Sequence, residues 1–374
     1  MKLSILQENF ARGLATTSRS VATRAQLPVL SNILLKTDQG RLKLSATNLE
    51  TGINLWLGAK IEKEGAISVP AKILTEFVAS LPAGKVEMEA QENSLKITSG
   101  SYEASFVGMA SSEFPAIPSL KKKADLTLSG SLLASAINEV AFAAAQDEGR
   151  PVLAGVLLKS QEERLVLVAT DGYRLSFKKL KEITGLGRVK DLKKGLVLPA
   201  RTLFEVAKIT ADDEEGKLGV SVTPEANQLI FATSEVEVVS RLIEGNFPDF
   251  EKIIPEKGKT KALLDREELT RAVRMAAIFA RESANIVKFT IGGSRFEVSA
   301  NTAQVGENKS VLEAKIEGEK GEIAFNSRYL LDFLSVVGSE QVSFEMSGGL
   351  NPGVFRAVGE PSYLHIIMPV RVQK

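Results

Sequence analysis

The stretch of residues 28–48, PVLSNILLKTDQGRLKLSATN, decides the fold because the chain contains a second version of it. Residues 151–171, PVLAGVLLKSQEERLVLVATD, align with the first version without a gap, and eleven of the twenty-one positions are identical. A fainter third version, IVKFTIGGSRFEVSANT, covers residues 286–302. Each version predicts a strand, a polar turn and a second strand with alternating apolar residues. Three versions spaced by about 125 residues predict three similar domains of ordinary size.

The segments around these versions predict the same elements in each copy. An amphipathic helix precedes the strand pair, a second helix follows it, and alternating strands close the copy. The apolar residues of the first helices are Leu6, Phe10 and Leu14, then Leu133, Ile137, Val140 and Ala144, then Leu269, Val273, Ala276 and Ala280. Asp265 with Glu268, and Asn326, are typical helix caps. We expect an α+β fold with two helices on antiparallel sheet in each of three domains, 1–120, 121–254 and 255–374.

The composition is that of a globular protein, with 44% hydrophobic and 25% charged residues. No apolar run reaches the roughly 18 residues that a membrane span needs, and the N-terminal residues lack a signal-peptide layout. The absence of cysteine excludes disulfides and thiol chemistry and fits a reducing cytoplasm. The single histidine, His365, excludes Cys/His zinc sites, two-His sites and most Ser-His-Asp arrangements. We expect no membrane contact, metal or cofactor.

The sequence contains no recognisable catalytic motif. It has no Walker loop, no G-x-G-x-x-G after a strand and no nucleophile elbow. The acidic run of residues 212–215 does not match an EF-hand, and we interpret it as an exposed loop. His365 lies in an apolar strand, HIIMPV, and is expected to be packed. We therefore predict that the protein is not an enzyme; a metal-dependent phosphodiesterase that uses the acidic run is a minor alternative.

Basic residues recur at one position in the three copies, just inside the start of the second helix. An acidic residue follows four positions later in each case, so a surface ion pair is the simplest alternative. The pairs are Lys72 with Glu76, Arg201 with Glu205, and Arg328 with Asp332. However, a cation near a helix N-terminus opposes the macrodipole, and the basic-before-acidic order is the weaker one. We predict that these cations face a polyanion instead.

Further basic residues accompany the first helices and their exits, among them Arg24, Arg150 and Arg281. No aromatic residues are interleaved with them, which favours phosphate contacts without sequence reading. The formal net charge is only +1. Binding to nucleic acid would therefore require the basic residues to be segregated onto one surface.

Geometry relates the predicted helices to the size of a DNA duplex. Six helices from one chain, at an interaxial spacing of ~8–10 Å, give a ring that helix bulk nearly fills. Twelve helices from two chains leave a free bore of about 20–28 Å, which admits a duplex. Head-to-tail closure would join copy one of one chain to copy three of the other and hide the sheet edges. Three chains would also admit a duplex, so this geometry excludes only the monomer.

Together, LPVLSNILL, ATDGYRL, NFPDF and the terminal IIMPVRV resemble the bacterial β sliding clamp family, the processivity subunit of DNA polymerase III. The resemblance covers the whole chain. It implies a homodimeric ring around double-stranded DNA that tethers the DNA polymerase III catalytic subunit without catalysing a reaction. It also implies loading by an ATP-driven clamp loader and binding of other proteins that carry a clamp-binding motif.

The resemblance also implies site residues. A peptide pocket between the second and third domains would be lined by Leu153, Thr170, Gly172, Tyr173, Arg174, Leu175, Pro248, Lys252, Ile253, Ile366, Met368, Pro369, Val370 and Arg371. Family contacts to DNA match Arg24 and the region of Arg150. The dimer interface would include Phe106, Ile278 and Phe279. Because Ile278 and Phe279 are adjacent on a helix, only one of them can point straight into the core.

A second class of function fits the repeats as well. A repeat-built scaffold could bind peptides without ever encircling DNA. This alternative predicts a monomer or an open arc, and it predicts no retention on circular DNA.

Overall fold

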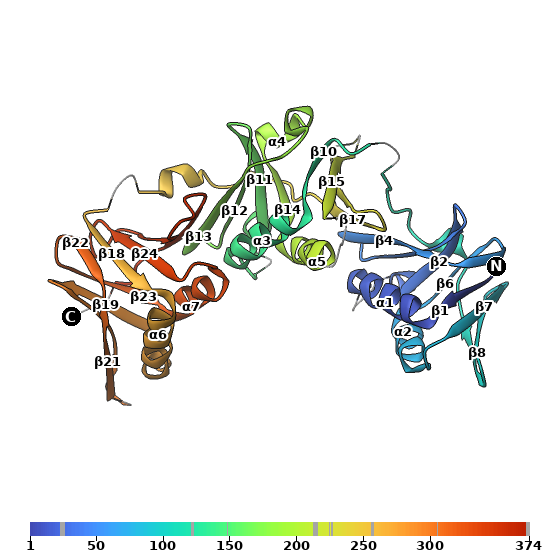
Figure 1. Ribbon diagram of the computed structural model, residues 1–374, viewed down its shortest axis with the longest axis horizontal. Coiled ribbons are helices and arrows are strands. Elements are labelled where there is room, and N and C mark those ends of the chain that lie inside the picture. The colour runs from blue at the N-terminus through green and yellow to red at the C-terminus, as the bar shows by residue number, and fades with distance from the viewer. Residues whose placement is uncertain are drawn as a thin grey trace. The chain divides into compact units, whose positions relative to one another are not determined.

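The computed structural model describes residues 1–22, 27–120, 123–147, 149–211, 216–223, 225, 227–255, 258–304 and 306–371. The chain packs as two compact units. Figure 1 labels the helices and strands named below. Unit 1 combines Met1–Ala134 with Ile183–Asp191 and Arg201–Leu242, and unit 2 combines Ser135–Glu182 with Leu192–Ala200 and Ile243–Lys374. The second sequence copy therefore contributes to both units. The predicted limits of the three domains stay predictions.

Unit 1 contains two antiparallel sheets among its described residues. The eight-stranded sheet has the order β10 (Leu126–Ser129), β15 (Lys217–Val222), β16 (Gln228–Ala232), β17 (Val236–Arg241), β4 (Thr51–Gly58), β3 (Arg41–Thr47), β2 (Asn32–Asp38), β6 (Ala66–Pro70). The five-stranded sheet has the order β5 (Lys60–Lys63), β1 (Lys2–Leu6), β7 (Lys85–Gln91), β8 (Ser94–Ser99), β9 (Tyr102–Val107). The pairing of β17 with β4 makes strands of two copies continuous in one sheet.

Unit 2 also contains two antiparallel sheets within its described part. The nine-stranded sheet has the order β14 (Leu196–Pro199), β11 (Gly155–Gln161), β12 (Arg164–Thr170), β13 (Arg174–Leu180), β26 (Tyr363–Ile367), β25 (Gly353–Ala357), β24 (Gln341–Met346), β18 (Thr260–Asp265), β22 (Lys315–Gly318). The four-stranded sheet has the order β21 (Gly306–Glu313), β20 (Arg295–Thr302), β19 (Ile286–Gly292), β23 (Gly321–Asn326). Here β13 of the second copy pairs with β26 of the third.

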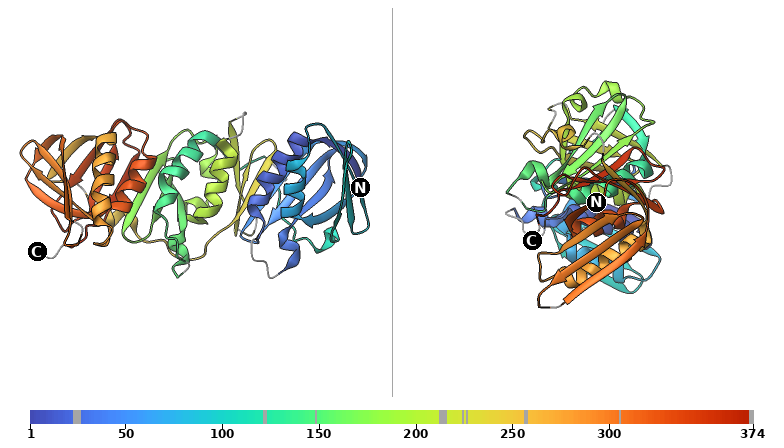
Figure 2. Two further views of the ribbon diagram at one scale, coloured as in Figure 1. Left: turned by 90° about the horizontal axis from the view of Figure 1, so that it is seen from below. Right: turned by 90° about the vertical axis from the view of Figure 1, so that its left-hand side faces the viewer.

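Two helices accompany the strands of each copy, as the sequence predicts. They are α1 (Gln7–Thr17) with α2 (Ala71–Ser80), α3 (Gly130–Val140) with α5 (Ala200–Ala211), and α6 (Arg266–Ala280) with α7 (Ser327–Val336). In the first and third copies the two helices lie side by side (Figure 2). A short additional helix, α4 (Asp191–Lys194), was not predicted. Helices packed on antiparallel sheets confirm the α+β prediction.

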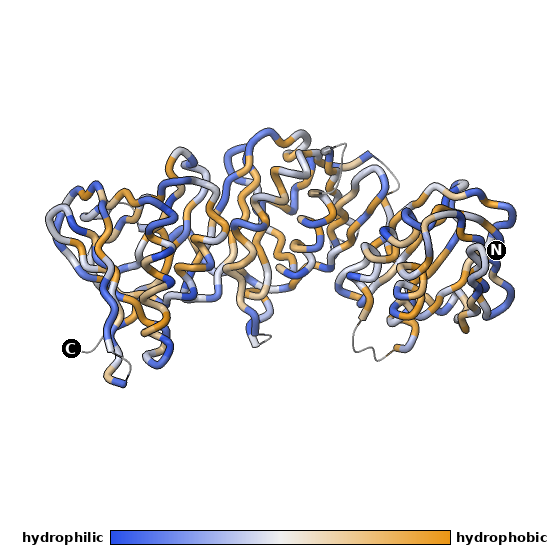
Figure 3. Tube along the Cα trace, turned by 60° about the horizontal axis from the view of Figure 1, so that its bottom comes forward, coloured by the Kyte–Doolittle hydropathy of each residue, from blue (hydrophilic) through white to orange (hydrophobic). Residues whose placement is uncertain are grey.

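The repeated hairpins follow directly from their turn residues. Between β2 and β3 the chain turns through Gln39 and Gly40, both with positive φ. Glu162 and Glu163 take the same left-handed backbone between β11 and β12, at a steric cost that glycine would avoid. Along the strands hydrophobic and hydrophilic residues alternate (Figure 3), so each strand presents one apolar face to the core.

The helix caps and the buried helix residues are those that the sequence patterns predict, except at the N-terminus of α1 and the C-terminus of α3. The Asp265 side chain accepts a hydrogen bond from the backbone N of Glu268, and Asn326 caps α7 through the backbone N of Arg328. The prediction that Leu6 lies on the apolar face of the first helix is wrong. Leu6 ends β1, precedes α1 and is 58% exposed. Likewise, Ala144 is buried but lies beyond the end of α3.

Candidate functional site

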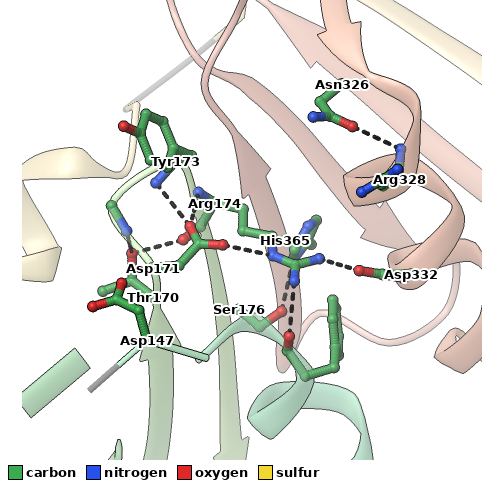
Figure 4. Close-up of polar contacts among 12 residues, drawn as sticks. Asp147, Thr170, Asp171, Tyr173, Arg174, Ser176, Asn326, Arg328, Asp332 and His365 are labelled. Carbon is green, nitrogen blue, oxygen red and sulfur yellow. Dashed lines mark hydrogen bonds and ion pairs between the residues drawn. The ribbon is translucent and has the colours of Figure 1, made fainter. Parts of the chain in front are cut away.

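A tight turn of residues 170–174 lies between β12 and β13 in unit 2 (Figure 4). Thr170 Oγ1 donates to the carbonyl oxygen of Arg174 (2.6 Å) and accepts from the backbone N of Gly172 (3.0 Å). Asp171 Oδ1 accepts from the backbone N of Tyr173 (2.8 Å) and of Arg174 (3.0 Å). Gly172 has a φ of 92°, a conformation that suits glycine. The turn leaves the Tyr173 side chain 60% exposed.

The Arg174 guanidinium is buried behind this turn. Its Nε donates to Asp171 Oδ2 (3.0 Å), Nη1 to Asp332 Oδ2 (2.5 Å) and Nη2 to the carbonyl oxygen of Phe142 (3.0 Å). The rings of Phe142 and Tyr329 stack against it. Arg174 therefore ties the second copy to α7 of the third, and it presents little free charge to a ligand.

The other predicted pocket residues divide into a buried layer and an exposed rim. Leu175 and Ile366 are buried with Phe250 in one apolar cluster, and Leu153 is half-buried. The tail passes the turn because the backbone N of Met368 donates to the Tyr173 carbonyl (2.8 Å). Met368 is 39% exposed. The remaining predicted residues are exposed or half-buried: Pro248, Lys252, Ile253, Pro369, Val370 and Arg371.

Arg150 lies beside the turn, at a position that sequence reasoning did not predict. A Cβ added to Gly172 would lie 3.3 Å from its Nη1. The Arg150 guanidinium forms an exposed ion pair with Asp147, with Nη2 3.3 Å from Oδ2. Arg150 was predicted as a DNA contact. Its position beside the turn of residues 170–174 also places it at the edge of the predicted peptide pocket. The spacing of residues in the sequence does not indicate that Arg150 lies beside Gly172. The two residues come together because β12 pairs with β11 and runs back toward the start of β11.

The basic residues at the second-helix starts do not form the ion pairs of the alternative interpretation. Glu205 pairs instead with Arg19 (3.2 Å) and Lys208 (2.9 Å), and Asp332 pairs with Arg174. Throughout the described ranges, no ion pair joins Lys72, Arg201 or Arg328 to the acid four residues later. All three cations are exposed on the first turns of α2, α5 and α7. Internal ion pairing therefore does not account for them.

The remaining predicted DNA and interface residues occupy contrasting environments. Arg281 is exposed at the C-terminal end of α6, and Arg24 lies outside the described residues. Phe106 is only 7% exposed and packs edge-to-face on Phe77 inside the first-copy core. Ile278 is 57% exposed, whereas Phe279 is half-buried against the third-copy core. The two adjacent residues thus divide between surface and core, as a helix requires.

The described residues offer little for catalysis. His365 is completely buried, its Nδ1 lies 2.6 Å from Ser176 Oγ, and its ring stacks on Phe333. Burial, followed by the nearby Arg174 charge, lowers the pKa of His365 well below its ordinary value. No group of three or more His, Asp or Glu side chains in the described ranges could hold a metal ion. The acidic run of residues 212–215 lies outside these ranges.

No described helix is both long and apolar enough to cross a membrane.

Comparison with known protein families gives matches along nearly the whole chain. Residues 1–118 match the N-terminal domain of the DNA polymerase III beta subunit, residues 127–249 its central domain and residues 251–371 its C-terminal domain. Each match contains one of the three sequence copies.

Individual proteins agree with this. The beta sliding clamp of Synechocystis sp. is 30% identical over the full length of both chains, and that of Staphylococcus aureus is 28% identical over 99% of each. Among solved structures, the DNA polymerase sliding clamp of Bacillus subtilis has a TM-score of 0.91 at 27% identity. The sliding clamp of Bartonella birtlesii, bound to griselimycin, has a TM-score of 0.92 at 28% identity. Both structures are covered completely, as is this chain.

Proposed function

Because this chain belongs to the family of DNA polymerase III beta subunits, we propose that it works as a homodimeric ring around duplex DNA and tethers the replicative polymerase. The family consists of non-catalytic sliding clamps with the three-domain DNA clamp fold, and this chain is a DNA sliding clamp. Persistence on DNA then comes from topology, and weak phosphate contacts allow sliding. We place it in the cytoplasm with the DNA it encircles.

The observation that best supports the DNA-facing role is the repeated cation. Lys72, Arg201 and Arg328 lie at the same helical position in the three copies. Of the acids four residues later, Glu205 pairs with Arg19 and Asp332 pairs with Arg174. An exposed cation in a first helical turn is unfavourable next to the macrodipole unless an anion compensates it. A DNA backbone supplies such an anion.

For ring closure, we propose contact between copy one of one protomer and copy three of its partner. In the described part of the chain, β9 and β21 lie at free ends of their sheets. β9 exposes Val107 (83%), and β21 exposes Val311 (53%), so both edges carry apolar side chains with unpaired backbone groups. Ile278 supplies further exposed apolar surface on α6. Mutual pairing would bury edges that otherwise favour aggregation.

For polymerase and clamp-loader binding, we propose the surface around the turn of residues 170–174. Tyr173 and Met368 are exposed and lie next to the buried Leu175 and Ile366. The exposed side chains can adjust to a bound peptide, and the buried ones hold the surface beneath them in place. Arg150 adds a cation at one side. Short linear peptides that carry the clamp-binding motif are the expected ligands.

One experiment tests ring assembly and peptide binding together. Light scattering after a sizing column should give twice 40.3 kDa for the chain, and a fluorescent peptide from the polymerase III catalytic subunit should co-elute. Deletion of residues 368–374 should abolish peptide binding and leave the dimer intact. Loss of the dimer on deletion would refute the assignment of the peptide site. A stable monomer of the full chain would contradict the ring.

A further inference from the structure

The turn of residues 170–174 has a counterpart in unit 1, at residues 47–51. Thr47 Oγ1 donates to the Thr51 carbonyl oxygen (3.0 Å), as Thr170 does to that of Arg174. Asn48 Oδ1 accepts from the Thr51 backbone N (2.7 Å), as Asp171 does from that of Arg174. Each turn is followed by a strand and faces the second helix of the next copy, α5 for the first turn and α7 for the second. The two sites can therefore be compared position by position.

The side chains that surround Arg174 have smaller or differently charged counterparts in unit 1. Thr51 replaces Arg174 itself, and its hydroxyl bonds to Thr202, the counterpart of Tyr329. Arg19 lies in the 3-10 helix Ser18–Ser20 after α1, where Phe142 lies in the 3-10 helix Ala141–Ala143 after α3. Glu205 of α5 corresponds to Asp332 of α7. A guanidinium and a phenol ring are thus missing. In their place is a cavity of about 540 Å³.

Charge decides what this cavity can hold. Its lining includes Arg19, Arg201, Lys208 and one carboxylate, Glu205, which leaves three positive charges against one negative, or +2. Both carboxylate oxygens are already engaged, Oε2 by Arg19 (3.2 Å) and Oε1 by Lys208 (2.9 Å). Arg201 has no ion pair among the described residues. The Arg174 site, with Arg328 counted as the counterpart of Arg201, has two carboxylates against two guanidiniums and therefore no net positive charge. The unit 1 cavity therefore suits an anion.

We propose that this cavity is a seat for one phosphate group of the DNA backbone, with Arg201 as its ligand and with Arg19 and Lys208 held in place by Glu205. A planar guanidinium with several donors is well matched to phosphate oxygens. The proposal rests on the proposed function, because the encircled duplex supplies the phosphate. It makes one of the three repeated cations part of a built site, whereas Lys72 and Arg328 stay surface contacts.

Substitutions can distinguish a specific phosphate site from a general electrostatic effect of positive charge on DNA binding. Arg201→Gln removes the ligand at an exposed position. Thr51→Arg with Thr202→Tyr should instead refill the cavity in the manner of Arg174 and its aromatic neighbour. The double substitution adds a positive charge, so general electrostatics predicts tighter binding to DNA. A phosphate seat predicts weaker binding, because the filling side chains occupy it and pair with Glu205.

The measurement is the fluorescence anisotropy of a labelled duplex of about two helical turns, at several salt concentrations. Loss of one phosphate contact should reduce the slope of log K against log salt concentration by about 0.9. We expect this reduction for Arg201→Gln and for the filling pair, with no further reduction when the two are combined. Lys72→Gln serves as the control, whose effect should add fully to that of the filling pair.

Tighter binding of the filling variant, or full additivity with Arg201→Gln, would overturn the proposal. Inorganic phosphate, titrated by calorimetry, tests the source: binding that depends on Arg201 while the duplex slopes stay unchanged would overturn the assignment to DNA. If the filling pair does not fold, Thr51→Arg alone takes its place, since it also adds a positive charge while its guanidinium occupies the cavity. Failure of the unaltered chain to stay on a circular plasmid onto which its clamp loader has placed it would instead contradict the proposed function itself.

Discussion

At the scale of the residue, Arg174 illustrates how a position predicted for ligand binding can act through structure. Its guanidinium makes three hydrogen bonds to two carboxylates and one carbonyl oxygen, and it is only 7% exposed. It therefore fixes the turn that presents Tyr173, and it ties that turn to α7. None of its partners except Asp171 is near in sequence, so the sequence could identify Arg174 but not its role.

Arg174→Ala should lower the free energy of unfolding by about 3 kcal/mol, because it leaves the largely buried Asp171 carboxylate without its cation. Arg150→Ala is the matched control. It breaks an exposed ion pair and should cost less than about 1 kcal/mol. Urea denaturation of both variants measures the difference. Equal effects would mean that the Arg174 network adds no stability beyond that of a surface pair.

His365 gives a pH dependence that can be isolated, because it is the only histidine of the chain. Burial lowers its pKa, so between the folded value and about 6.5 the unfolded chain binds a proton that the folded chain does not. The free energy of unfolding should therefore fall as the pH is lowered below about 6.5, by at most about 1.4 kcal/mol per pH unit. Above this pH the histidine has no effect on the slope.

His365→Phe should remove this slope between pH 6.5 and 5.5 in urea denaturation series. Glu139 has the opposite sign, since burial raises its pKa, and its contribution to stability declines as the pH rises above about 4.5. It is present in both proteins and cancels in their difference. Identical slopes for the two proteins would show that folding does not lower the pKa of His365.

At the scale of the element, local signals predicted the helices well and their ends less well. Helix α6 begins at the predicted Asp265 cap, and α7 begins after Asn326. Leu6 was misassigned because the last residue of a strand continued the apolar spacing of the helix behind it. The four-residue helix α4 has no apolar periodicity that a sequence pattern could reveal.

The second helices are the elements expected to face DNA. Reversing Lys72, Arg201 and Arg328 to Glu should weaken binding to duplex DNA and reduce its dependence on salt, because three phosphate contacts are replaced by repulsion. The control reverses Lys60, Lys217 and Lys315, exposed lysines of strands β5, β15 and β22, and so changes the net charge equally. Anisotropy with a labelled duplex compares the two. Equal losses would assign the effect to net charge alone.

At the scale of the whole molecule, the sequence predicted three copies but not how their sheets join. The pairings of β17 with β4 and of β13 with β26 link strands about 180 residues apart, and edge strands carry no sequence signal for a particular partner. These pairings divide the second copy between two units. The unit 1 cavity, which joins residues of the first copy to α5, follows from the pairing of β17 with β4, which is why spacing alone could not predict it.

The central claim is that the protein holds DNA by encircling it. The most direct test loads the chain, with its clamp loader and ATP, onto a nicked circular plasmid and isolates the complex by gel filtration in high salt. We predict that the protein stays with the circular DNA and is released when a restriction enzyme linearises the plasmid, because a ring can then slide off the ends. Release from the intact circle at the same rate as from the linear form would contradict the account.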